Sequence, residues 1–176
     1  MLVHLRRAVI LTIIFFALCG LAYGYAATGL SHVLFRHQAD GSITANGSTL
    51  IGQSWSGPGW FQGRPDSNTP MASGAANLGP RSQALEQAAA KQVDALKKQG
   101  IQPTPGLVTT SGSGLDPDIS PTDAYAQVDA VAGARHLAAP QVHQLVASHV
   151  HIAELGFLGS DYVNVLELNQ ALAQVR

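Results

Sequence analysis

An uncharged apolar run near the N-terminus constrains the fold of this chain more than any other feature. The twenty positions 8–27 carry no charged side chain. A helix of that length, rising about 1.5 Å per residue, is about 30 Å long and matches the hydrocarbon core of a bilayer. A cleaved signal peptide is the alternative, because Ala22-Tyr23-Gly24 resembles a cleavage site with small residues. The length of the run favours a retained transmembrane helix at 8–27.

The basic residues around this run predict its orientation. Arg6 and Arg7 precede it, and the next Lys or Arg is Arg36. Because Lys and Arg favour the cytoplasmic side, we expect residues 1–7 in the cytoplasm and residues 28–176 as one extracytoplasmic domain. The chain is then a single-pass protein of the inner (plasma) membrane, in contact with membrane lipid through its helix.

Small side chains recur at a spacing of four residues within and just after the run. Gly20, Gly24 and Thr28 would share one face of a helix. Such a face lets another helix approach closely, so it is a candidate contact with a partner helix. The alternative is that glycine is simply frequent in membrane helices.

Charge and cysteine usage exclude several classes of function. The formal net charge is −1, which gives no strong field towards nucleic acid, and we expect no nucleic-acid partner. Cys19 is the single cysteine and lies in the apolar run, which excludes an internal disulfide framework and a cysteine-rich metal site. We expect no bound metal.

The pattern beyond the apolar run mixes helices and strands without a regular repeat. Residues 82–99 carry apolar side chains on one face and precede a glycine, which predicts a helix. Ser120 and Asp123 form a capping-box pattern that predicts a second helix start. Further helices are expected from Pro140 and over 169–175, and strands over 49–53, 106–110 and 163–166. The predicted fold class is α+β, an irregular α/β domain after one transmembrane helix.

A long segment before the first domain helix, residues 54–80, is rich in Gly, Pro, Ser and Asn. Trp55, Trp60 and Phe61 lie in it, so we expect an ordered loop held by aromatic anchors. Trp60, Phe61 and Arg64 are candidates for contact with a partner, because Arg and aromatic residues dominate interface energetics. The alternative is that they pack on their own domain.

Two patterns resemble a catalytic serine and a histidine metal site, but neither has the spacing that such a site requires. Ser54 follows Gly52-Gln53 but misses the Gly-x-Ser-x-Gly nucleophile pattern by one residue. His143, His149 and His151 cluster in sequence, yet their spacing is poor for a shared metal on a helix, which favours surface histidines. A membrane-anchored hydrolase and an extracytoplasmic solute-binding module remain the alternative functions.

Several segments, in their order, follow one family pattern along essentially the whole chain. They are Leu50–Gln53, Trp60–Pro65, Ala72–Leu78, Val108–Pro121, Gln127–Val128, Val131–Arg135 and Val163–Asn169. On these segments the chain resembles the C subunit family of the bacterial Kdp potassium-transporting ATPase. Asp118 departs from that pattern, because the family usually has His there.

The resemblance implies a subunit without catalytic residues of its own, needed to assemble the complex. Its partners would be the A subunit, which conducts potassium, and the B subunit, a P-type ATPase. The family's C subunit has been proposed to act as a catalytic chaperone that raises the B subunit's affinity for ATP, and Gln53 resembles the residue proposed to contact the nucleotide. The orientation predicted above instead places Gln53 across a bilayer from cytoplasmic ATP, which favours a structural or partner role.

Overall fold

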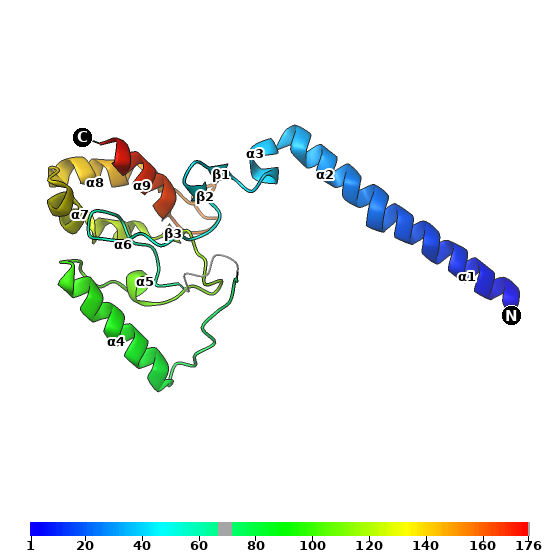
Figure 1. The fold of residues 1–176 in the computed structure, drawn as a ribbon, viewed down its shortest axis with the longest axis horizontal. Coiled ribbons are helices and arrows are strands. Elements are labelled where there is room, and N and C mark those ends of the chain that lie inside the picture. The colour runs from blue at the N-terminus through cyan, green and yellow to red at the C-terminus, as the bar shows by residue number, and fades with distance from the viewer. Residues whose placement is uncertain (67–71, 176) are drawn as a thin grey trace. The chain divides into compact units, whose positions relative to one another are not determined.

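The structure is a computed structural model that describes residues 1–66 and 72–175. It divides into two compact units, Met1–Ile43 and Thr44–Arg176, which are described separately. Both helices and strands are present, which confirms a mixed fold with one apolar N-terminal helix (Figure 1).

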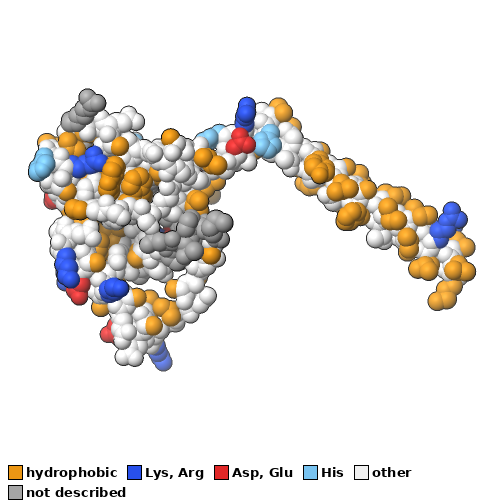
Figure 2. Space-filling model, in the orientation of Figure 1, with side chains coloured by type: hydrophobic (Ala, Val, Ile, Leu, Met, Phe, Trp, Pro, Cys, Tyr) orange, Lys and Arg blue, Asp and Glu red, His pale blue; other side chains and the backbone are white. Residues whose placement is uncertain are grey.

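The first unit is dominated by one continuous helical run, Leu2–Leu34. It is the single helix, among the described residues, that is long and apolar enough to cross a membrane, with a mean hydropathy of 2.1. Figure 2 shows hydrophobic side chains along most of its length. The run comprises α1 (Leu2–Phe15), the π-helix η1 (Phe16–Ala22) and α2 (Tyr23–Leu34), and the short α3 (Arg36–Ala39) follows.

The π-helical segment lies in the middle of the apolar run. The Tyr23 N–H donates to the Leu18 carbonyl five residues back, instead of four as in an α-helix. The Thr12 hydroxyl donates to the Ala8 carbonyl at 2.9 Å, so this polar group is satisfied within its own helix. Apolar side chains and internally satisfied polar groups are what a helix in hydrocarbon requires.

The second unit combines a small sheet with helices. A three-stranded antiparallel sheet has the order β3-β5-β4, with Ile119 and Val150 both opposite Val163. α7 packs against α8, α8 packs against α9, and α4 contacts α5. The elements are β1 (Ile43–Thr44), β2 (Gly47–Ser48), α4 (Gln83–Lys98), α5 (Pro105–Val108), β3 (Asp118–Ile119), α6 (Pro121–Tyr125), α7 (Val128–Arg135), α8 (Ala139–Ser148), β4 (Val150–His151), β5 (Tyr162–Asn164) and α9 (Val165–Gln174).

Local capping explains several helix starts. The Ser120 hydroxyl accepts from the Asp123 N–H at 3.2 Å, and the Asp123 carboxylate accepts from the Ser120 N–H at 3.1 Å. This confirms the predicted capping box at the start of α6. Pro140 lies in the first turn of α8, as expected, and the Asn164 side chain caps α9 by accepting from the Glu167 N–H.

Three predicted strands are wrong or shortened, each for a local reason. Residues 49–53 form turns and coil after β2. Residues 106–110 begin as α5 because Pro105, at the first position of that helix, has the fixed φ that favours a helical turn. The strand expected at 163–166 ends at Asn164, because the Asn164 cap starts α9 at Val165.

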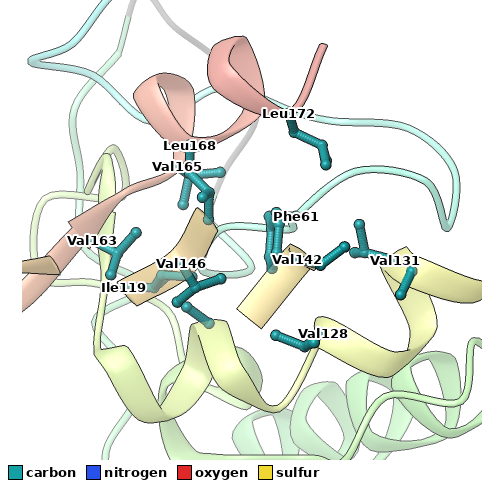
Figure 3. Packing of buried hydrophobic residues seen from close by; sticks show 12 residues of the cluster. Phe61, Ile119, Val128, Val131, Val142, Val146, Val163, Val165, Leu168 and Leu172 are labelled. Atoms are coloured by element: carbon teal, nitrogen blue, oxygen red, sulfur yellow. The ribbon is translucent and has the colours of Figure 1, made fainter. Parts of the chain in front are cut away.

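The main core lies between α7, α8, α9 and the sheet. Val131, Val146 and Leu168 are completely buried there. In Figure 3, Phe61 lies among side chains from these helices, although it comes from the long loop. A smaller cluster of Leu96 and Leu107 holds α4 to α5, together with Ile101.

Candidate functional site

The aromatic segment, defined here as Trp55–Phe61, turns inward onto its own domain. Phe61 has no exposed surface and belongs to the main core. Trp55 and Trp60 are partly buried, with ring centroids 5.1 Å apart. The Arg135 guanidinium lies 4.2 Å from the Trp60 ring and donates to the Gly59 carbonyl at 2.8 Å. The prediction of an ordered loop held by aromatic anchors is confirmed for this segment.

Two buried carboxamides hold the backbone that follows. Asn169, on α9, accepts from the Phe61 N–H and donates to the Phe61 carbonyl, both at 2.9 Å. Gln127, just before α7, accepts from the Gln62 N–H at 2.8 Å and donates to the Gln62 carbonyl at 3.0 Å. Both amide side chains have no exposed surface. They satisfy a loop backbone that would otherwise be buried without partners.

Sequence reasoning assigned no role to Gln127 or Asn169. A signal was available for Asn169, because it lies four residues after Val165 and three before Leu172, both on the buried face of α9. A polar residue at such an apolar position has a partner in most folded proteins. The partner itself, 108 residues earlier in the chain, is invisible to local patterns.

Arg64 and Asp66 tie the end of the loop to residues 109–116. The Arg64 guanidinium donates to the Thr110 carbonyl at 3.0 Å and lies 3.5 Å from the Asp116 carboxylate. The Asp66 carboxylate accepts from the Ser111 N–H and hydroxyl at 2.6 and 2.7 Å, and from the Asp116 N–H at 2.9 Å. A carboxylate with three such donors fixes the geometry of both segments.

Gly52 and Gln53 also make contacts within the domain. Gly52 donates its N–H to the Leu115 carbonyl at 2.8 Å, and a Cβ at this position would lie 2.6 Å from the Asp116 carbonyl oxygen. Only glycine fits so close an approach. The Gln53 amide donates to the Ser48 carbonyl at 3.2 Å and packs against Gly47, whose φ is +130°.

The three expected partner residues all have contacts within their own domain. Trp60 is covered by Arg135, Phe61 is buried, and Arg64 is bound to Thr110. The structure therefore accounts for each of them by the alternative interpretation, packing of the loop on its own domain. Their contact with another subunit stays a prediction.

The histidines are dispersed over separate contacts. His143 stacks on Tyr125 with ring centroids 4.5 Å apart, and His149 Nδ1 lies 2.8 Å from the Leu145 carbonyl. His151 Nε2 lies 3.2 Å from the Glu167 carboxylate, on β4 rather than on the helix end expected from sequence. Within residues 1–66 and 72–175, no group of three or more His, Cys, Asp or Glu side chains could hold a metal ion.

Asp118 lies beside this last pair, and its environment disfavours its charge. Partial burial raises the pKa of the Asp118 carboxyl above its ordinary value of 3.8, and the Asp116 carboxylate adds to the rise. The Asn164 amide, which donates to Asp118 at 2.9 Å, acts in the opposite direction on this pKa. The raised pKa thus reflects incomplete solvation.

The small-residue face of the helix can be approached at both glycines. Gly20 is exposed, and the Phe16 ring lies 3.8 Å from the position that a Cβ on Gly20 would occupy, an ordinary van der Waals distance. At Gly24, nothing lies within 4 Å of the corresponding position. The Ser31 hydroxyl donates to the Thr28 carbonyl at 2.8 Å. An approaching helix would meet the backbone at these small residues.

Comparison with known proteins assigns the family. Residues 5–174 match the sequence model of the family described as "K+-transporting ATPase, c chain". The chain is 44 % identical to the potassium-transporting ATPase KdpC subunit of Sorangium cellulosum, over all of both chains. It is 45 % identical to that of Allorhizobium ampelinum, over 98 % of this chain and 96 % of the relative. It is 40 % identical to that of Geobacter sulfurreducens, over 96 % of each.

These matches extend across the apolar N-terminal helix and the second unit. They include the aromatic segment and the two carboxamides that hold the backbone at its end, Gln127 and Asn169. The chain therefore belongs to the KdpC family, the c chains of K+-transporting ATPases.

Proposed function

We propose that this chain is an accessory subunit, without catalytic residues of its own, that assembles and stabilises an ATP-driven potassium uptake complex. Its partners are a channel-like A subunit, which conducts potassium, and a P-type ATPase B subunit. The observation that carries this proposal is the full-length relationship to KdpC subunits, together with one exposed apolar helix joined to a separately packed domain.

The helix anchors the chain and meets the channel-like subunit through Gly24 and its neighbours. At about 1.5 Å per residue the 33-residue run is about 50 Å long, so it is longer than the roughly 30 Å hydrocarbon core that it has to span. Arg6 and Arg7 hold its start in the cytoplasm, and the second unit is extracytoplasmic. Close packing at Gly24 supplies contact that lipid cannot replace.

An effect on ATP affinity would reach the ATPase subunit through the complex rather than through Gln53. The Gln53 amide is engaged with Ser48 and Gly47 inside its own domain, which supports a structural role. The catalytic-chaperone function is then a coupling free energy between subunits. It predicts that Gln53→Ala in the assembled complex changes the Kd for ATP only as far as it disturbs folding. Nucleotide binding by this chain alone, at the affinity of the complex, would contradict that role.

Co-purification from native membranes tests assembly. A tagged wild-type chain should capture two larger membrane subunits, and Gly24→Leu should reduce that capture, because a bulky side chain at this open position blocks the close approach of another helix. Ala26→Leu is the matched control, since it lies on the opposite face of the helix. Capture of both subunits by Gly24→Leu at the wild-type level would remove the helix-face part of the proposal.

The hydrolase alternative makes a different prediction. Ser54 is exposed, and His149, which follows α8, contacts Ser148 and Leu145 of that helix. Ser54→Ala and His149→Ala should therefore leave potassium uptake by the complex unchanged. Loss of uptake in either variant, with normal assembly, would favour chemistry at these residues.

A further inference from the structure

A second loop rich in bulky apolar residues points outward. The docking loop, defined here as residues 152–158, follows β4 and precedes β5. Ile152 is 74 % exposed, Leu155 82 %, Phe157 73 % and Leu158 51 %. Isolated exposed apolar side chains are ordinary, but four large ones within seven positions form a patch of the kind that marks interaction sites.

Backbone hydrogen bonds give this loop a defined shape. Glu154 and Leu158 exchange N–H···O bonds of 3.1 and 2.9 Å, and the Gly156 N–H donates to the Ala153 carbonyl at 2.9 Å. The Asp161 carboxylate accepts from the Ala153 N–H, also at 2.9 Å. The apolar side chains are therefore presented by a closed turn and need little ordering before they bind.

Leu155 is a bulky residue at a turn position that suits glycine better. Its φ is +54°, in the left-handed region that bulky residues avoid, and its side chain is 82 % exposed. Glycine would occupy this position without strain. The turn therefore does not require leucine here, and contact with a partner would give this exposed side chain a role.

The charge around the loop distinguishes a protein partner from a lipid surface. Residues 136–175 contain Glu154, Asp161 and Glu167 but no Lys or Arg. Loops and helices that insert into anionic membranes carry basic residues beside their apolar ones, whereas carboxylates are repelled there. Both Glu154 and Asp161 are exposed, so the partner should offer positive charge around an apolar depression.

We propose that the docking loop seats on another subunit of the potassium-transporting complex, at an extracytoplasmic apolar depression rimmed by Lys or Arg. This inference rests on the proposed function, because it requires the chain to be part of such a complex. Leu155 and Phe157 fill the depression, and Glu154 and Asp161 pair with its rim. The aromatic segment, which is covered by its own domain, stays outside this contact.

Site-specific photo-crosslinking identifies the occupant. Benzoylphenylalanine replaces Phe157 in the full chain, expressed with its native membrane partners and irradiated in native membranes. We expect an adduct with one larger subunit, at an apolar site with basic neighbours. The same probe at Lys91, exposed on α4, should give no such adduct. An adduct only with lipid, only with a second copy of this chain, or with nothing would overturn the proposal.

Substitution tests the energetics independently of the probe. Leu155→Ser combined with Phe157→Ser should lower the yield of co-purified subunits by about ten-fold or more, as expected for anchor residues of an interface. Glu154→Lys should lower it through repulsion from the basic rim. Leu78→Ser and Lys91→Glu, at exposed positions elsewhere in the domain, are the matched controls and should retain the wild-type yield.

The proposed function and the role of the docking loop can be refuted separately. If the wild-type chain captures no other subunit, the proposed function is wrong. If the wild-type chain captures its partners and the double variant captures them equally well, only the docking loop is wrong. Unchanged tryptophan fluorescence of the double variant verifies its fold, since Trp55 and Trp60 are the two tryptophans and both lie in the aromatic segment.

Discussion

The aromatic segment and the docking loop both carry bulky apolar residues, but the folded domain buries them in one and exposes them in the other. Each is a seven-residue stretch between regular elements that combines such residues with glycine. Phe61 in the first has no exposed surface, whereas Phe157 in the second is 73 % exposed. This difference in exposure does not come from a difference in hydrophobicity. It depends on whether the rest of the domain offers hydrogen-bond partners for the loop backbone.

The carboxamides of Gln127 and Asn169 are those partners. Each pairs with both the N–H and the carbonyl of one loop residue, so the backbone of Phe61 and Gln62 enters the core without losing hydrogen bonds. The docking loop closes its hydrogen bonds on itself, and its side chains are left outside. The comparison predicts that the first loop determines stability and the second determines assembly.

The largest expected effect comes from truncating the two phenylalanines. Phe61→Ala should destabilise the chain by about 3–5 kcal/mol, because it leaves a cavity in the main core. Phe157→Ala should change stability by less than about 0.5 kcal/mol, because its side chain is in solvent. Denaturant unfolding followed by tryptophan fluorescence measures both. Equal losses would remove the distinction between the two loops.

The next largest effect tests the carboxamide clamp. Asn169→Ala leaves the Phe61 N–H and carbonyl without partners and should cost about 2–3 kcal/mol. Gln174→Ala, at an exposed position on the same helix, is the matched control and should be nearly neutral. The same unfolding experiment measures this difference. If Asn169→Ala lost no more stability than the control, the loop would be held by packing alone.

The smallest effect concerns Asp118, which lies on β3 of the three-stranded sheet. Its raised pKa means that the folded chain binds this proton more tightly than the unfolded chain does. The stability contributed by this group is therefore present below its ordinary pKa and is lost as the pH rises through the raised one. Asp118→Asn keeps the acceptor for Asn164 and removes that loss, so the variant should be slightly more stable than wild type at neutral pH.

A pH series of unfolding experiments measures this difference. The gain of Asp118→Asn should disappear below pH 3.8, where the wild-type carboxyl is also protonated. Asp94→Asn, at an exposed position on α4, provides the comparison. A variant less stable than wild type at neutral pH would show that the Asp118 charge is favourable where it stands.

Local signals predicted part of the fold correctly. The apolar face of residues 82–99 and the capping box at Ser120 both appear where expected, because each depends on neighbours within one or two helical turns. The start of α9 was misplaced, because the apolar run from Val163 to Leu166 fits a strand as well as a helix. Only the capping role of Asn164 separates the two.

The candidate site was less predictable, because it depends on distant pairs. The aromatic residues indicated an ordered loop, yet Asn169 and Gln127 lie 108 and 65 positions from the backbone they hold. The exposure of the docking loop depends on which residues the folded domain leaves uncovered. The alternation and spacing of apolar residues along the sequence do not contain that information.

Cysteine accessibility before and after assembly tests the contrast between the two loops most directly. Cys19→Ser removes the native thiol, and Ser56→Cys or Leu158→Cys adds one exposed thiol to the aromatic segment or to the docking loop. We predict that assembly with the other subunits slows maleimide labelling at position 158 strongly and leaves position 56 unchanged. Equal labelling of position 158 in the free chain and in the complex would contradict the account.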